Sequence, residues 1–198
     1  MKVIGFNGSP RKDSNTAMLI QRVFAELEKE GIETELVQLA GKTLPGCRGC
    51  YQCWVNMDRK CIQKGDDLNL YVDKMLESDG IILGSPTFYA DVTAGMKALM
   101  ERSAFVAKAN GNMLRRKVGA GVVAVRRGGQ LHTFETLNNF FLINEMVVPG
   151  SSYWNFAFGL EKGDVEKDDE GMQTMVTLGQ NMAWLLKKLG DTPQEWGG

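Results

Sequence analysis

The fold is decided by the stretch Gly8-Ser9-Pro10-Arg11-Lys12-Asp13-Ser14-Asn15-Thr16, which joins the apolar run Val3-Ile4-Gly5-Phe6 to an amphipathic segment. A strand, a polar loop and a helix in this order aim free backbone N–H groups at a bound anion. The glycine spacing of a dinucleotide-binding loop and the Gly-Lys-Ser/Thr ending of a Walker loop are both absent. The stretch is therefore either a hydroxyl-rich phosphate loop or an ordinary turn in which Ser14 is the N-cap of the helix.

The rest of the chain continues this alternation of strands and helices. Apolar or alternating runs predict further strands at 33–39, 80–84, 118–125 and 146–148. Helical periodicity predicts helices at 66–76, 92–105, 131–144 and about 170–189. We therefore expect one α/β domain over residues 1–198, built on a doubly wound five-stranded parallel sheet with helices on both faces.

Two segments interrupt this pattern. Residues 40–65 hold all four cysteines and predict a cysteine-rich insertion. Residues 150–170 change from aromatic to acidic, which favours an active-site flap followed by a solvated linker over 164–170.

Composition excludes several classes of protein. The 198 residues carry a net charge of −1, and the basic runs at 115–117 and 126–127 are too short for a nucleic-acid interface. No apolar run reaches the roughly twenty residues needed to cross a bilayer, so no membrane partner is expected. The apolar start of the chain stops at Asn7, too early for a signal peptide. We expect a cytoplasmic protein whose cysteines stay reduced.

Three polar loops follow predicted strands, at 8–16, 85–91 and 126–129. In a doubly wound sheet, ligands bind beyond the carboxyl ends of the strands, where the strand order reverses. The three loops are therefore expected to converge on one ligand, which favours the phosphate-loop interpretation of the first.

These loops together resemble the flavodoxin-like, NAD(P)H-dependent FMN reductases over residues 1–150. The resemblance rests on the Gly8-Ser9-Pro10-Arg11 and Ser85-Pro86-Thr87-Phe88-Tyr89 segments and on Arg127-Gly128-Gly129. It implies an FMN site whose phosphate group is held by Ser9, Arg11, Ser14, Asn15 and Thr16.

The other two loops would then surround the rest of the flavin. By the resemblance, Pro86, Thr87, Phe88 and Tyr89 run beside the ribityl chain and one edge of the isoalloxazine, although core packing is the alternative for the two aromatic residues. Gly128 and Gly129 would let backbone N–H groups approach the pyrimidine edge. Arg127 would stabilise the anionic reduced flavin, while a solvated side chain is the alternative for one of Arg126 and Arg127.

The cysteines have the spacing Cys-x2-Cys-x2-Cys-x7-Cys, at positions 47, 50, 53 and 61. Three cysteines this close, with a fourth further along, have a compact spacing similar to that of ferredoxin motifs. The pattern resembles that of the iron–sulfur flavoproteins, a branch of the same group, with the spacer before the last cysteine at the long end of its range. The resemblance implies that Cys47, Cys50, Cys53 and Cys61 bind a [4Fe–4S] cluster; a zinc site and four empty thiols remain alternatives.

His132 is the only histidine and follows the third loop, so it is a candidate proton donor near the flavin, the alternative being an exposed side chain in the first turn of a helix. The leading hypothesis is an FMN-dependent oxidoreductase that relays electrons between FMN and the cluster. NAD(P)H or a reduced ferredoxin would be the donor, and a small molecule or a protein the acceptor. The resemblance also implies a homodimer or homotetramer. The alternatives are an FMN or quinone reductase without a cluster, a non-enzymatic electron carrier and a flavin-binding protein with structural zinc.

Overall fold

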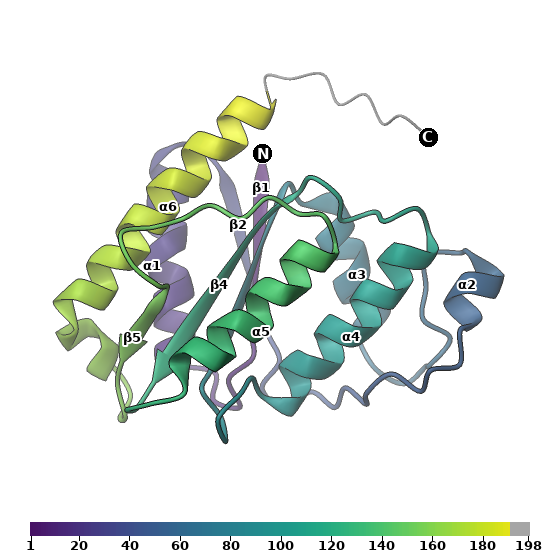
Figure 1. Cartoon of the computed structure of the whole chain (residues 1–198), viewed down its shortest axis with the longest axis horizontal. Helices are drawn as coiled ribbons and strands as arrows, with labels where there is room; N and C mark the ends of the chain where they lie inside the picture. Colours follow the sequence, from purple (N-terminus) through teal and green to yellow (C-terminus); the bar gives the residue numbers. More distant parts are fainter. Residues whose placement is uncertain (191–198) are drawn as a thin grey trace.

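The computed structural model describes residues 1–190, and its centre is a five-stranded, all-parallel sheet (Figure 1). The strand order is β2-β1-β3-β4-β5, so the order reverses between β1 and β3. The strands are β1 (Lys2–Asn7), β2 (Glu33–Gln38), β3 (Gly80–Pro86), β4 (Val118–Val125) and β5 (Phe156–Phe158). The predicted doubly wound parallel sheet is therefore confirmed.

Helices cover both faces of the sheet because successive strand residues point to opposite sides. One core lies between the sheet and the helices α1 (Asn15–Lys29) and α6 (Asp169–Gly190). The other lies between the sheet and α3 (Leu68–Glu77), α4 (Ala94–Ala109) and α5 (Gln130–Ile143). On β1, for example, Val3 belongs to the first core and Ile4 to the second. Among residues 1–190, no helix is long and apolar enough to span a membrane.

The fifth strand is not where the sequence predicts it. Val147 forms only an isolated bridge with Val118 at the start of β4, and the strand that pairs with the end of β4 is Phe156–Phe158. Pro149 and Gly150 separate the two segments, and proline has no N–H to continue a ladder. The prediction at 146–148 was therefore wrong as a strand, and part of the supposed flap belongs to the sheet.

The acidic segment that follows is also more ordered than a solvated linker. It contains the short 3-10 helix η1 (Asp164–Lys167). Asp164 accepts hydrogen bonds from the backbone N–H groups of Leu160 and Glu161, and Asp168 accepts from those of Phe158 and Gly171. These carboxylates cap local backbone turns, so their role is structural.

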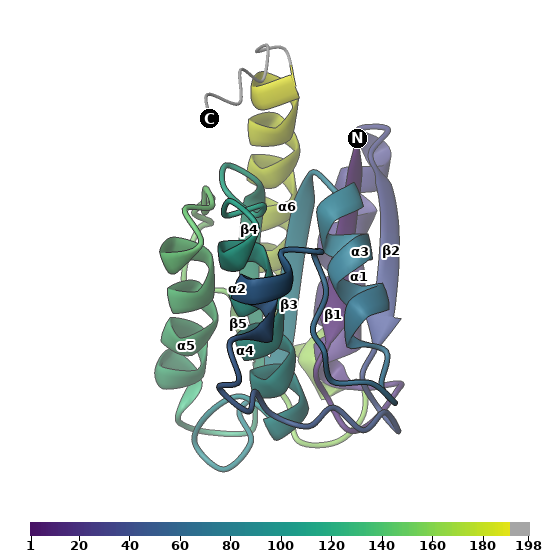
Figure 2. The ribbon, with the colours of Figure 1, turned by 90° about the vertical axis from the view of Figure 1, so that its right-hand side faces the viewer.

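The cysteine-rich segment lies outside the two main cores. Its one regular element among the described residues is the short helix α2 (Gln52–Asn56), which packs against α4 (Figure 2). The segment leaves the sheet after β2 and returns to it through α3. The cysteines are thus placed beside α4, away from the sheet itself.

Candidate functional site

The loops after β1 and β3 are joined by hydrogen bonds at the carboxyl end of the sheet. Gly8 N donates to the carbonyl oxygen of Gly84 at 2.8 Å, and Thr93 Oγ1 donates to the carbonyl oxygen of Gly8 at 2.7 Å. A Cβ on Gly84 would lie 2.9 Å from Thr16 Cγ2, so only glycine lets the start of α1 come this close. The strand order reverses at this place, and the predicted convergence of the first two loops is observed.

The first loop contains the N-cap that the turn interpretation predicts. Ser14 is the N-cap of α1, because its Oγ accepts from Ala17 N at 3.2 Å. Asn7 organises the loop from the strand end: its Nδ2 donates to Ser14 Oγ at 3.2 Å and its Oδ1 accepts from Ser9 N at 3.0 Å. Ser9 Oγ in turn accepts from Arg11 N at 3.2 Å. Asn7 is a residue of this site that motif reasoning missed.

Thr16 carries the observation that points to a ligand. Thr16 is 1% exposed, and its Oγ1 has no hydrogen-bond partner among the described residues. An unpaired buried hydroxyl costs about 1–3 kcal/mol, so native proteins rarely leave one without a reason. Its place in the first turn of α1 is where a phosphate group would supply the missing acceptor.

Asn15 does not lie as the sequence predicts for a free phosphate ligand. Its Oδ1 accepts from Gly163 N at 2.8 Å and its Nδ2 donates to the carbonyl oxygen of Glu161 at 2.9 Å. The same turn brings Lys162 Nζ to 3.3 Å from Asp13 Oδ2. Asn15 therefore fastens the turn after β5 to the first loop, a role that only the tertiary structure reveals.

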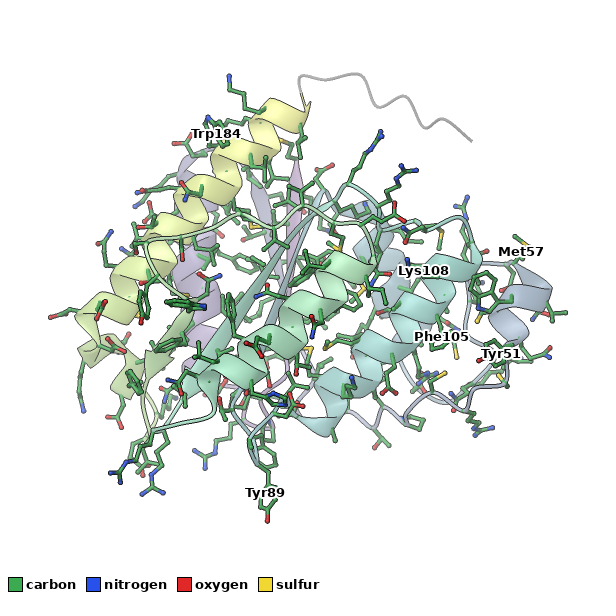
Figure 3. The ribbon with its side chains drawn as sticks, in the orientation of Figure 1. Tyr51, Met57, Tyr89, Phe105, Lys108 and Trp184 are labelled. Atoms are coloured by element: carbon green, nitrogen blue, oxygen red, sulfur yellow. The ribbon has the colours of Figure 1, made fainter. Side chains whose placement is uncertain are left out.

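The second loop exposes its aromatic residues. Thr87 N donates to the carbonyl oxygen of Ala124 at 2.8 Å, which continues the pairing of β3 with β4. Phe88 is exposed and Tyr89 fully so, and Figure 3 shows Tyr89 pointing away from the body of the protein. Core packing, the alternative for these two residues, is therefore wrong. Pro86 is half-buried at the end of β3.

The third loop is held against the second. Gly129 has φ +89°, and a Cβ there would lie 3.0 Å from Thr87 Cγ2, so the close approach requires glycine. Thr133 Oγ1 donates to Thr87 Oγ1 at 3.1 Å. A Cβ on Gly128 would meet no atom within 4 Å, so open space lies beside it. Arg126 and Arg127 are both exposed.

His132 is exposed in the first turn of α5, and its Nε2 lies 3.4 Å from Asp91 Oδ2. Burial raises the pKa of Asp91, but the hydrogen bond from Val92 N and further contacts outweigh this, so the pKa lies below its ordinary value. Asp91 is thus a carboxylate that can pair with a protonated His132. The exposed position agrees with the structural alternative for this histidine.

The four cysteines line one small cavity beside α4, together with Arg102 and Phe105. All four thiols are free, and Cys50 is the exposed one. Burial raises the pKa of the Cys53 thiol. Among residues 1–190, no three Cys, His, Asp or Glu side chains are arranged to hold a single metal ion. The structure thus brings the four sulfur donors to one cavity without a preformed ion site.

Cys61 has the most elaborate surroundings of the four cysteines. Arg102 Nη2 donates to Cys61 Sγ at 3.4 Å, and Arg102 Nη1 lies 2.7 Å from Asp66 Oδ2. Burial lowers the pKa of the Arg102 guanidinium, but the hydrogen bonds with Asp66 and Cys61 outweigh this and raise the pKa. Sequence reasoning missed Arg102, because nothing in its helical segment distinguishes it from an exposed arginine.

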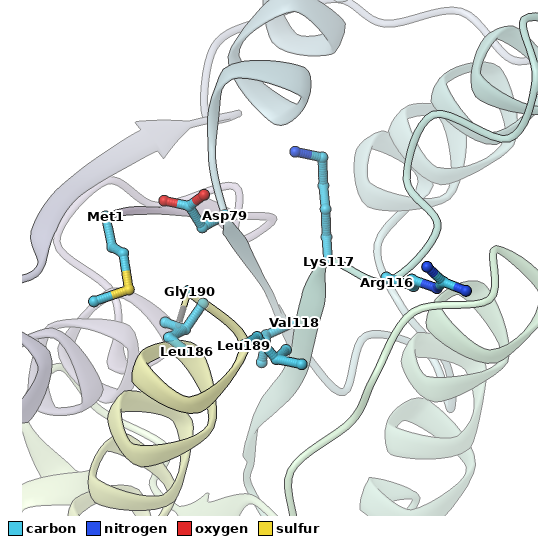
Figure 4. A pocket seen from close by; sticks show the side chains of 8 residues that line it. All are labelled: Met1, Asp79, Arg116, Lys117, Val118, Leu186, Leu189 and Gly190. Carbon is cyan, nitrogen blue, oxygen red and sulfur yellow. The ribbon is translucent and has the colours of Figure 1, made fainter. Parts of the chain in front are cut away.

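A separate cavity of about 80 Å³ lies at the opposite, amino-terminal end of the strands (Figure 4). Lys117 lines it, and its Nζ donates to the carbonyl oxygens of Leu76, at 2.9 Å, and Ser78. Burial lowers the pKa of Lys117. These contacts cap the carboxyl end of α3, so Lys117 has a structural role. The cavity is remote from the three loops.

With the geometry established, the chain can be compared with known proteins. The profile of the NADPH-dependent FMN reductase family matches residues 1–161. An iron–sulfur flavoprotein of Methanocaldococcus jannaschii is 42% identical, over 94% of this chain and 98% of the relative. An iron–sulfur flavoprotein of Methanosarcina thermophila is 30% identical, over 94% and 96% of the two chains.

Solved structures agree on the fold. RosB with a bound 8-demethyl-8-formylriboflavin-5'-phosphate intermediate superposes with a TM-score of 0.74 at 20% identity, covering 98% of this chain and 81% of RosB. A flavodoxin from the domain Archaea gives a TM-score of 0.61 at 18% identity, covering 94% and 99% of the two chains. Family profile and full-length relatives agree, and the chain therefore belongs to the NADPH-dependent FMN reductase family, within its iron–sulfur flavoprotein branch.

Proposed function

We propose that this flavin oxidoreductase binds FMN at the three loops, binds a [4Fe–4S] cluster at its four cysteines and relays electrons between the two. The observation that carries the FMN site is the unpaired, buried Thr16 Oγ1 at the helix start, where the loops converge. Family membership supports the flavin, and the names of the full-length relatives support the cluster.

The FMN phosphate fits the first loop by its chemistry. Thr16 would donate its unpaired hydroxyl, and the exposed guanidinium of Arg11 would add charge. Ser9 Oγ accepts from a backbone N–H and keeps its hydroxyl hydrogen available, whereas the Ser14 hydroxyl caps the helix and donates to Asn7 Oδ1 at 3.4 Å. Asn15 would act through the 159–163 turn, which it holds beside the loop.

The flavin ring would lie between the second and third loops. Pro86, Thr87 and the exposed Phe88 and Tyr89 offer apolar surface on one side. The open space beside Gly128 would admit the ring edge, with Gly129 shaping the turn. Arg127 would place positive charge where reduction adds negative charge to the ring. Bound FMN supplies exchange between two-electron and one-electron chemistry.

The cysteine cavity suits a cluster for a different reason. Cys47, Cys50, Cys53 and Cys61 supply four sulfur donors to one cavity, and thiolates are the ligands that iron–sulfur clusters require. Gly49 N donates to Cys47 Sγ at 3.5 Å, a backbone N–H···S bond of the kind that tunes such clusters. Zinc would use the same sulfur atoms, so metal analysis decides between them.

Family membership supports a redox partner for this protein. A nicotinamide cofactor, NADH or NADPH, or a reduced ferredoxin would deliver electrons, and a small molecule or another protein would accept them. We further infer a cytoplasmic homodimer or homotetramer in which the cysteine segment of one subunit approaches the flavin of a neighbour. The test must distinguish this proposal from two alternatives, which are a reductase without a cluster and a non-enzymatic electron carrier.

The test is a pair of variants analysed after anaerobic purification and reconstitution. Cys50→Ser should lose iron, sulfide and the broad cluster absorbance while keeping FMN. Thr16→Val is the matched control, which should weaken FMN binding while keeping the iron. A wild-type protein with a flavin spectrum and no iron would remove the cluster from the proposal, and zinc in its place would support a structural site. Steady oxidation of NAD(P)H with a quinone acceptor would exclude the pure carrier.

A further inference from the structure

Arg102 links the two ends of the cysteine segment through one guanidinium group. Its Nη1 donates to the carbonyl oxygen of Pro45 at 3.2 Å, just before the first cysteine. The same Nη1 lies 2.7 Å from Oδ2 of Asp66, which follows the last cysteine by five residues. Its Nη2 donates to Cys61 Sγ at 3.4 Å. One side chain of α4 therefore contacts the entry, the exit and one sulfur atom of the segment.

The stability of the fold does not by itself require a buried ion pair at this position. The side chains of Arg102 and Asp66 are 0% and 3% exposed. Buried ion pairs are often no more stable than well-packed apolar residues of similar size, because removing both charges from water is costly. In addition, Arg102 Nε has no hydrogen-bond partner among the described residues, and the side chain lines the cysteine cavity. A buried donor of a cavity-lining side chain is thus left without an acceptor.

A second residue holds the backbone of the same cysteine. Asn69, in the first turn of α3, accepts from Cys61 N at 2.8 Å through its Oδ1 and donates to the Cys61 carbonyl oxygen at 3.0 Å through its Nδ2. Cys61 is thus held at its backbone by Asn69 and at its sulfur by Arg102. It follows the longest spacer of the motif, and these contacts come from residues outside that spacer.

We propose that Arg102 is a positioning residue that raises the reduction potential of the cysteine-bound cluster through its contact with Cys61. This inference rests on the cluster in the proposed function. An N–H···S bond and a nearby buried cation stabilise the more negative, reduced cluster, and both are recognised determinants of cluster potential. Asp66 moderates the effect, because its carboxylate neutralises part of the charge of Arg102: Oδ2 lies 2.7 Å from Nη1, and Oδ1 accepts at 3.3 Å from Nη2, the nitrogen that also contacts the sulfur.

Removing the charge of Asp66 alone and removing both charges should therefore shift the cluster potential in opposite directions. In Asp66→Asn, Arg102 keeps its charge and loses its counter-ion, so the cluster potential should rise above that of the wild type. In Asp66→Asn/Arg102→Gln, the cation is also removed and two neutral amides remain to bond each other, so the potential should fall below that of the wild type. A purely structural role for the pair would produce loss of iron in both variants rather than shifts of opposite sign.

The experiment is a redox titration of anaerobically reconstituted protein, followed by electron paramagnetic resonance of the reduced cluster, with iron content measured on each sample. Lys108→Gln is the control, because it removes a positive charge from the same helix at a residue that does not line the cavity (Figure 3). Its potential should stay near that of the wild type. Potentials that move in the same direction in both Asp66 variants, or that match the wild type, would overturn the inference and leave the proposed function standing. A wild-type protein without iron would overturn both the inference and the cluster of the proposed function. Its absorption spectrum, which would lack the cluster bands, identifies this outcome.

Discussion

Asn15 Nδ2 donates a hydrogen bond of 2.9 Å to the carbonyl oxygen of Glu161, a residue 146 positions further along the chain. The contact joins the first turn of α1 to the turn that follows β5. One amide side chain therefore connects the turn after the last strand of the sheet to the first loop. The motif alone assigns this asparagine to a ligand, whereas the structure assigns its hydrogen bonds to another part of the protein.

Asn15→Ala should therefore lower both stability and FMN affinity. Two hydrogen bonds, with Glu161 and Gly163, are lost, so we expect the free energy of unfolding to fall by about 1–3 kcal/mol. Urea unfolding of the FMN-free protein and flavin-fluorescence titration measure the two effects. Asn181→Ala, which removes an exposed hydrogen bond to the carbonyl oxygen of Gly150, is the control. Weaker FMN binding at unchanged stability would instead make Asn15 a direct phosphate ligand.

Thr16→Val should separate binding from folding. Valine keeps the shape of threonine and removes a hydroxyl that has no partner among the described residues, so the unfolding free energy of the FMN-free protein should not decrease. Loss of a hydrogen bond to a charged phosphate should weaken FMN binding by about tenfold or more. The control is Thr177→Val on α6, whose hydroxyl bonds its own helix through the carbonyl oxygen of Gln173. Equal FMN affinities for both variants would contradict the phosphate role.

The two glycines of the third loop should respond differently to alanine. Gly129 has φ +89°, and alanine there should cost about 1–2 kcal/mol of stability, before its contact with Thr87 is counted. Gly128→Ala meets no atom within 4 Å, so the FMN-free protein should keep its stability. The flavin edge would meet the added methyl group, and FMN binding should fall. Thermal unfolding with and without FMN measures both; a Gly128→Ala protein that binds FMN normally would place the ring elsewhere.

The contact between α1 and α6 should make stability depend on pH. Glu26 is buried there: Lys29 Nζ lies 2.7 Å from its Oε1, and Gln180 Nε2 donates to its Oε2 at 3.3 Å. The hydrogen bond from Lys29 lowers the pKa of Glu26 below the ordinary value of 4.5, although burial opposes this. Because the folded state has the lower pKa, the carboxylate's contribution is complete above pH 4.5 and is lost as the pH falls through the folded-state value.

Glu26→Gln should accordingly be less stable than the wild type at pH 7, and the difference should shrink below pH 4.5. Urea unfolding at several pH values gives the comparison. Glu28→Gln, at a neighbouring position of α1 that faces Thr34, serves as the control for removing a carboxylate from this helix. A stability difference that stays constant across the acid range would show that the charge of Glu26 does not contribute to stability.

Local patterns in the sequence account for most of the architecture. The apolar runs of β1, β3 and β4 and the periodic helices follow from burial on one or both sides. The local sequence of each short segment shows this pattern without reference to the rest of the chain. Ser14 illustrates the same point, because an N-cap depends on its own neighbours along the chain. The fifth strand could not be placed in this way. Val147 and Phe156 both lie beside β4, and only competition for the free edge of that strand decides which segment completes the sheet.

The sequence by itself therefore determined the parallel sheet, the three loops at its carboxyl edge and the spacing of the four cysteines. The tertiary structure alone decided that Asn15 bonds the 159–163 turn and that Arg102 reaches Cys61. The physical reason is the range of the interactions. Strand, helix and cap signals act over a few residues, whereas a buried hydrogen bond between distant segments exists only after both have packed against the sheet.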